Sequence, residues 1–235
     1  MMRLAGEFVV IVIGVLTALA VDQVMGERQE RVLERELLLG FVENLRTDSI
    51  DYARLPELAN GRVASAELLL LNLAPGSRPD ANTAEALATL GPFEVPADDE
   101  AIVDAWAALF TPTDLDVALG SYTEFSAGGA QRLIQDRALR TRIHTYYYTV
   151  DLMQKWDPWV SGAIDKLADL AIEIGLSPDG SSAAEIRAGF ERDRGSLVAA
   201  LRYLQSRSRV QARIAGRLAG RASGLLEAIR QSLGE

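Results

Sequence analysis

The side chains that most often carry catalysis or bind metal ions are scarce in this chain. Its 235 residues include no cysteine and a single histidine, His144. The lack of cysteine excludes disulfides, thiolate metal sites and cysteine nucleophiles. His144 has no carboxylate or second histidine at the spacing of a metal site. The acidic run 98–100 suits the start of a helix, and it lacks the spaced oxygen ligands of a calcium loop.

The sequence also contains no phosphate-binding loop, dinucleotide fingerprint, serine-hydrolase elbow or zinc-protease motif. We therefore expect no enzymatic activity, no cofactor and no metal ion. The formal net charge of −9 argues against a general nucleic-acid binder, because phosphate contacts need a basic face.

Glu7 is an ionisable residue at the start of a long apolar run. Burying its charge in a membrane is costly, so we consider it a candidate functional residue that pairs with a partner helix or stays protonated. The alternative is that Glu7 lies at headgroup depth and is solvated. Gly14 and Ala18, further along the run, have the small-xxx-small spacing that lets a second helix approach closely.

Two rows of residues with an interval of four mark the carboxyl-terminal segment. Each glycine in a helix costs about 1 kcal/mol relative to alanine, and arginines four residues apart repel one another. We therefore expect the glycines to lie against another helix at short axial distance and the arginines to face acidic groups. The candidate interface residues are Arg213, Gly216, Arg217, Gly220, Arg221 and Gly224.

Residues 202–235 hold seven arginines and two glutamates, a net charge of +5 in an acidic chain. One interpretation is that this basic helix packs against the acidic remainder. The other is a docking strip for lipid headgroups or a partner. An aromatic group around residues 146–148, with Trp156 and Trp159, is expected to pack in the core, with a ligand pocket as the alternative.

The candidate residues near the amino terminus lie in the apolar run, whose composition predicts a membrane anchor at residues 1–26. Residues 8–21 form 14 uncharged residues, about 21 Å of helix, and extension to residues 4–25 gives a short span of the bilayer. The competing interpretation is a signal peptide cleaved before Val21, because Ala18 and Ala20 have cleavage-site spacing. Counting Lys and Arg would place the carboxyl domain inside, but long domains translocate largely regardless of charge, so the residues alone leave the topology open.

The pattern after residue 26 predicts an all-α fold: the membrane helix continues into an antiparallel helical bundle over residues 27–235. We expect a solvated stalk helix at 27–55, ended or kinked at Pro56, and short helices within 57–126. Long helices are predicted at 130–176 and 195–233, since apolar residues there recur at intervals of three and four. No stretch alternates with a period of two for long enough to build a sheet.

Segment 6–22, with Gly-Glu, an apolar run containing Ile-Gly, then Ala-Leu, resembles the opening of an uncharacterised bacterial family of single-span membrane proteins. The middle region, 122–128 with Leu139-Arg140 and Tyr146-Tyr147, is also similar to that family. The resemblance implies an anchor in the bacterial inner membrane and a helical carboxyl domain of unknown function in the periplasm. It implies no mechanism.

These features favour a non-enzymatic, membrane-anchored helical module that acts as an accessory or scaffold subunit. Its expected partners are the lipid bilayer, through residues 4–25, and other membrane-protein subunits or a second copy of the chain. The alternative is a periplasmic helical sensor or ligand-binding module, whose pocket the aromatic group would form.

Overall fold

The computed structural model describes residues 2–74, 76, 97–113, 118–127 and 129–234, and for residues 2–12 it describes the backbone alone. Within these ranges every regular element is a helix and no residue lies in a strand. The predicted all-α fold is confirmed.

The first helix, α1 (Met2–Leu73), contains 72 residues and is about 108 Å long at 1.5 Å per residue. It passes through Pro56 without ending, so of the two outcomes predicted at Pro56 the helix end is wrong, and the kink stays a prediction. Proline removes a backbone N–H and disfavours a helix interior. Leu55, Ala59 and Val63 are nevertheless fully or almost fully buried, and this packing holds the helix together across the proline.

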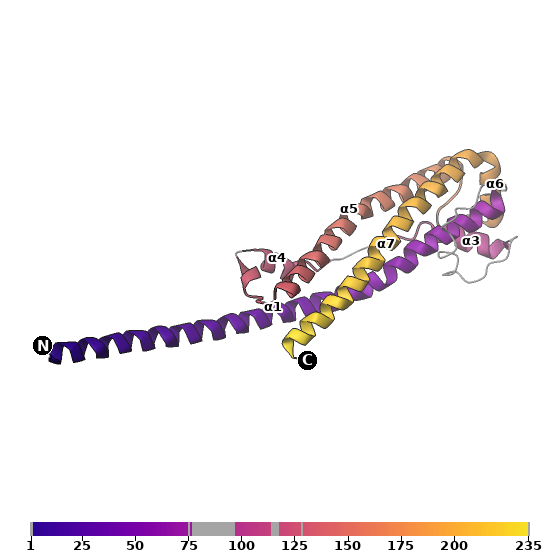
Figure 1. Cartoon of the computed structure of the whole chain (residues 1–235). Helices are drawn as coiled ribbons and strands as arrows, with labels where there is room; N and C mark the ends of the chain where they lie inside the picture. Colours follow the sequence, from indigo (N-terminus) through magenta and orange to yellow (C-terminus); the bar gives the residue numbers. More distant parts are fainter. Residues whose placement is uncertain (1, 75, 77–96, 114–117, 128, 235) are drawn as a thin grey trace.

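The expected solvated stalk at 27–55 is also only partly correct. Residues 27–36 are exposed except for the half-buried Glu34, but from Leu37 onward one side of the helix, with Leu37, Leu38 and Phe41, enters the core of the bundle. The first part of α1 extends away from the other helices, and the second part is packed among them (Figure 1).

Two further long helices, α5 (Arg137–Glu173) and α7 (Arg194–Leu233), pack with the second part of α1. α5 begins later than the predicted helix at 130–176 because Ala130–Arg132 forms a separate 3-10 turn, η1. α7 runs opposite to both α1 and α5, whereas α1 and α5 run in the same direction (Figure 1). Of the three long helices, α7 is therefore the antiparallel one. α1 and α5 are parallel because the long connection between them returns the chain to the end of the bundle where α1 enters it.

Three short helices complete the described fold. α3 (Asp99–Ala108) is capped by the side chain of Asp98, α4 (Gly120–Ser126) follows it, and α6 (Ala183–Arg192) begins with a capping box of Ser182 and Glu185. Of the predicted short-helix region 57–126, residues 57–73 belong to α1, and residues 77–96 and 114–117 lie outside the described residues.

The core consists of two main apolar clusters, one toward each end of the bundle. The first joins the middle of α1 to α4, the start of α5 and the end of α7, and the second joins the end of α1 to α3, α6 and the facing ends of α5 and α7. Buried polar residues lie between them on α1 and α7: Arg62, Glu67, Gln205, Ser208 and Gln211. This polar layer separates the two clusters.

No helix in the described part of the chain has an apolar stretch long enough to cross a membrane. The span predicted at residues 4–25 includes residues 4–12, whose side chains are outside the described part. The transmembrane helix remains a prediction.

Candidate functional site

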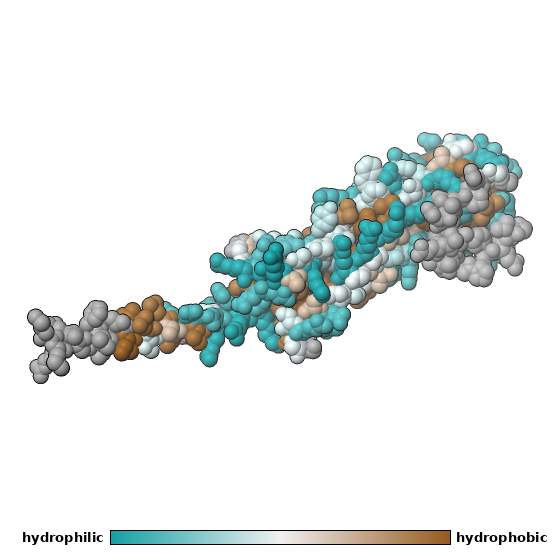
Figure 2. Space-filling model, viewed as in Figure 1, coloured by the Kyte–Doolittle hydropathy of each residue, from teal (hydrophilic) through white to brown (hydrophobic). Residues whose placement is uncertain are grey.

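The candidate residues near the amino terminus lie on the projecting part of α1. Gly14 has open space around it, and Ala18 is exposed. The side chain of Glu7 lies outside the described part. Figure 2 shows apolar side chains gathered on this projecting helix. The large exposed apolar residues there are Ile13, Val15, Leu16, Leu19, Val21, Val24 and Met25.

The glycine row of α7 does not pack closely against another helix in the described part of the chain. A methyl group added at Gly216, Gly220 or Gly224 would meet no atom within 4 Å outside its own helical turns. Gly216 and Gly220 are exposed, because the core side of α7 is formed by residues such as Leu218 and Ala222 on the opposite face. The prediction of close packing within the chain is wrong, and contact with a second protein stays a prediction.

The arginine row next to these glycines faces solvent as well. Arg213 and Arg217 are exposed and make no ion pair or hydrogen bond with another described residue. Arg221 donates from Nη1 to the backbone oxygen of Thr145 at 3.3 Å and to the hydroxyl of Thr149, both on α5. The prediction that these arginines face acidic groups is therefore wrong within the described residues.

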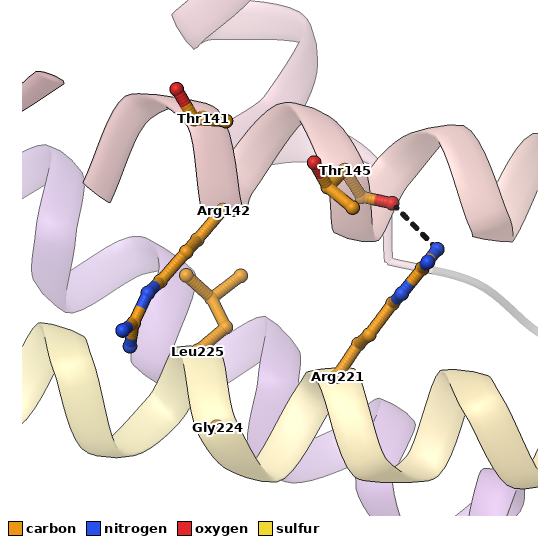
Figure 3. Close-up of a pocket in the computed structure, with 6 residues that line it drawn as sticks. All are labelled: Thr141, Arg142, Thr145, Arg221, Gly224 and Leu225. Carbon is orange, nitrogen blue, oxygen red and sulfur yellow. Dashed lines mark hydrogen bonds between the residues drawn. The ribbon is translucent and has the colours of Figure 1, made fainter. Parts of the chain in front are cut away.

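A pocket of about 220 Å³ opens between α5 and α7 beside this arginine row. Figure 3 shows Arg142 reaching from α5 toward α7, and Arg221 reaching in the opposite direction from α7. Leu225, which is almost fully buried, lies between them. Arg142 makes no polar contact with another described residue. The lining residues are Thr141, Arg142, Thr145, Arg221, Gly224 and Leu225.

The predicted aromatic group is divided between core and surface. Tyr146 and Tyr147 are buried, whereas Tyr148 is exposed. Trp156 and Trp159 lie elsewhere on α5, where their rings face the guanidinium of Arg207 at 5.4 and 5.1 Å from its Cζ. Tyr203 also faces Arg207, at 4.8 Å, so the tryptophans form a cation–π cluster with α7.

The buried tyrosines lie close to a buried carboxylate. Asp48, fully buried on α1, accepts hydrogen bonds from the hydroxyl of Tyr146 at 2.9 Å and from the backbone N–H of Ala118 at 3.2 Å. Burial, and then charge interactions that include Asp48, raise the pKa of Tyr52, Tyr146 and Tyr147.

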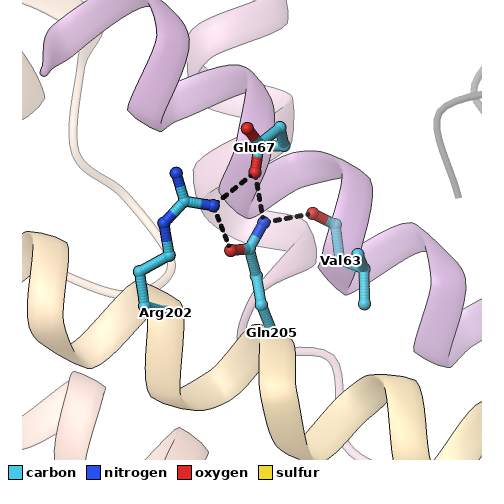
Figure 4. Close-up of polar contacts among 4 residues, drawn as sticks. All are labelled: Val63, Glu67, Arg202 and Gln205. Atoms are coloured by element: carbon cyan, nitrogen blue, oxygen red, sulfur yellow. Dashed lines mark hydrogen bonds and ion pairs between the residues drawn. The ribbon is translucent and has the colours of Figure 1, made fainter. Parts of the chain in front are cut away.

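Glu67 organises one part of the polar layer (Figure 4). Its Oε2 atom accepts hydrogen bonds from Arg202 Nη1 at 2.6 Å and from Gln205 Nε2 at 2.8 Å. Gln205 Nε2 also donates to the backbone oxygen of Val63 at 3.0 Å. The contact between Arg202 and Glu67 is an ion pair between the basic segment 202–235 and the acidic remainder of the chain.

Arg62 organises the neighbouring part. It is 1% exposed and donates to Gln211 Oε1 at 2.9 Å and to the backbone oxygen of Thr111 at 3.3 Å. Gln211 in turn donates to Asp157 Oδ1 at 3.0 Å. Burial lowers the pKa of Arg62 to about 10, and the charge of Asp157 acts in the opposite direction.

The sequence alone did not reveal Asp48, Arg62 and Glu67 as buried residues. Charged side chains on a helix usually lie on its solvated face, and nothing in their spacing marks these three as exceptions. A usable signal was the interruption of the apolar stripe of α7 by Gln205 and Gln211. His144 packs against the rings of Tyr122 and Phe125.

Asp98, which opens the acidic run 98–100, caps α3, and Asp99 pairs with Arg187 at 2.7 Å. The described residues contain no group of three or more His, Asp or Glu side chains that could hold a metal ion.

Comparison with known proteins adds no relative. No family model, no curated protein and no solved structure matches this chain.

Proposed function

We propose that the chain is a non-enzymatic, membrane-anchored helical module that serves as an accessory or scaffold subunit. The observation that carries the proposal is the projecting part of α1. It bears exposed apolar side chains and is continuous with the helix that organises the bundle.

The distribution of these side chains around the helix favours lipid as the environment. With 3.6 residues per turn, Ile13, Leu16, Leu19 and Val21 point in different directions and are each more than half exposed. A helix that is apolar on all sides belongs in a membrane or a core, whereas a single partner helix would cover one stripe only.

The length of the segment suits a short span. Residues 8–21 cover about 21 Å against a hydrocarbon thickness of about 30 Å. Glu7 and Asp22 at its two ends would lie toward the two interfaces, where charged groups cost less than at the centre. Local thinning of the bilayer accommodates a short span at a modest free-energy cost.

In this proposal the anchor lies in the bacterial inner membrane and the bundle in the periplasm, as the family resemblance implies. Arg213 and Arg217, which are exposed on α7 and have no polar partner among the described residues, then offer a surface to other membrane-protein subunits or to a second copy of the chain. The alternative, a ligand-binding or sensor module in the periplasm, is favoured by the pocket between α5 and α7.

Membrane attachment is tested by alkaline carbonate extraction of cell membranes that contain the full chain. We expect the chain to stay in the membrane pellet and the double variant Leu16→Glu, Leu19→Glu to be released. The matched control is Tyr148→Glu, Ile172→Glu, which changes two equally exposed residues of the bundle and should stay in the pellet. Release of the unaltered chain would exclude the anchor.

The accessory role is tested by the mass of the particle extracted in mild detergent. Size-exclusion chromatography with light scattering should give a protein mass above the 25.5 kDa of one chain, and Arg213→Glu, Arg217→Glu should reduce it. A mass of one chain from the native membrane contradicts the accessory role while leaving the anchor intact.

A further inference from the structure

The pocket between α5 and α7 combines two positive charges with an apolar floor. Arg142 and Arg221 come from different helices and reach across the gap in opposite directions on either side of Leu225 (Figure 3). The other described lining residues are two threonines and Gly224, and none of the six is acidic. The like charges therefore have no counter-charge within the described lining.

One of these guanidinium groups has hydrogen-bond partners on the facing helix, and the other has none among the described residues. The contacts of Arg221 Nη1 with Thr145 and Thr149 anchor its side chain on α5 and leave Nε and Nη2 without a partner among the described residues. Arg142 has no polar partner there. Two exposed guanidinium groups with donors left over suit an anion that enters from solvent, since guanidinium groups bind carboxylates through paired hydrogen bonds.

Gly224 gives the pocket its space. Nothing lies within 4 Å of the position where a side chain would begin at this residue, so a larger residue on α7 would fill the cavity. With Leu225 beneath it, the interior beside the two charges is apolar. The volume of about 220 Å³ is below the usual range for drug-sized ligands, about 300–1,000 Å³, and so fits a small molecule.

We propose that this pocket binds a small organic anion, a carboxylate carried on a compact apolar body. The carboxylate pairs with Arg142 and Arg221, and the apolar body lies over Leu225 beside Gly224. The site is separate from the anchoring segment, so it holds whether or not α1 enters a membrane.

The test measures binding of benzoate to the full chain by ligand-observed NMR, with neutral benzamide and inorganic phosphate as comparisons. We expect saturable binding of benzoate and at least about tenfold weaker binding of benzamide, which has the same shape without the charge. Phosphate, which has charge without an apolar body, should also bind at least about tenfold more weakly. No saturable benzoate binding, or equal binding of benzamide, overturns the proposal.

Two pairs of variants place the ligand in the pocket. Gly224→Leu should abolish benzoate binding, whereas Gly216→Leu, the same change on the same helix outside the pocket, should preserve it. Arg142→Gln should weaken binding at least about tenfold, and Arg213→Gln should leave it unchanged. Thermal melts establish that each variant is folded. If Arg142→Gln and Gly224→Leu bind benzoate as the unaltered chain does, the site is not this pocket.

Discussion

At the scale of single residues, Gly216 and Gly220 lower the helix propensity of α7 without close packing against another helix in the described part of the chain. Gly220 is exposed and has no neighbour within 4 Å of an added methyl group. Gly189 of α6 is the opposite case, because a methyl group there would lie 2.7 Å from Leu176 Cδ1. The same amino acid therefore has different roles in two helices of one chain.

We predict that Gly220→Ala raises the free energy of unfolding by up to about 1 kcal/mol, through helix propensity alone. Gly189→Ala gains the same helix propensity, but the added methyl group overpacks the core at a cost of about 1–3 kcal/mol, so we expect a net loss of up to about 2 kcal/mol. Urea denaturation of the two variants measures both signs. A destabilised Gly220→Ala would mean that a neighbour covers this face of α7.

The buried tyrosines give the protein a predictable response to alkaline pH. Their pKa values in the folded chain lie above the ordinary value of 10.0, so the folded state keeps protons that the unfolded chain loses. This contribution to stability is complete below about pH 10 and is lost as the pH rises above it. Burial lowers the pKa of Arg62 to about 10, so this group makes the free energy of unfolding rise with pH in the same range. It is a single group, and the three tyrosines outweigh it.

Tyrosinate absorbance should therefore stay below the value for full ionisation of the six tyrosines for as long as the chain is folded. We expect Tyr52, Tyr146 and Tyr147 to stay protonated above their ordinary pKa of 10.0 and to ionise only as the chain unfolds. Circular dichroism on the same samples reports unfolding. Ionisation of all six in one step, while the helices remain intact, contradicts the burial of this group.

At the scale of elements, the polar layer divides the bundle into two cores and sets how α7 lies along α1. Arg62 meets Gln211, and Glu67 meets Arg202 and Gln205. A shift of α7 by one turn would leave these buried groups without partners, at a cost of about 1–3 kcal/mol for each neutral group and more for charged ones. The layer therefore favours a single register, although buried polar groups add little net stability.

Gln211→Leu removes the side-chain acceptor of the buried Arg62 guanidinium and leaves the backbone oxygen of Thr111 as its described acceptor. We predict a loss of about 2–3 kcal/mol in the free energy of unfolding, measured by urea denaturation of the full chain. The control is Gln231→Leu at an exposed position of α7, where a surface change should stay within about 0.5 kcal/mol. Equal effects of the two variants would show that the polar layer has no special role.

Apolar periodicity was sufficient to predict the long helices of this fold, because α5 and α7 each keep one stripe against the core. It was not sufficient at Pro56, where the local rule for proline is outweighed by the burial of Leu55, Ala59 and Val63. The pocket could not be predicted either, since it depends on where Arg142 of α5 and Gly224 of α7 meet in space. The spacing of residues along one helix does not show which residues of another helix will lie beside them.

At the scale of the whole molecule, α1 connects two different environments in one continuous helix. Its carboxyl-terminal part is held by both cores and the polar layer, and its amino-terminal part carries exposed apolar side chains away from them (Figures 1 and 2). A bundle attached in this way would be held at a fixed distance and orientation from the bilayer, which suits a subunit that presents the arginine face of α7 to a partner.

The central claim, that this projecting segment lies in lipid, is tested most directly by spin labels at single cysteines, which the cysteine-free chain makes unambiguous. The full chain carrying Leu16→Cys or Tyr148→Cys is labelled and reconstituted into phosphatidylcholine vesicles. Relaxation of each label is then measured with oxygen, which concentrates in lipid, and with a nickel chelate, which stays in water. The proposal predicts that the label at residue 16 responds to oxygen and is protected from nickel, while the label at residue 148 responds to nickel. Equal exposure of both labels to nickel would contradict the anchor.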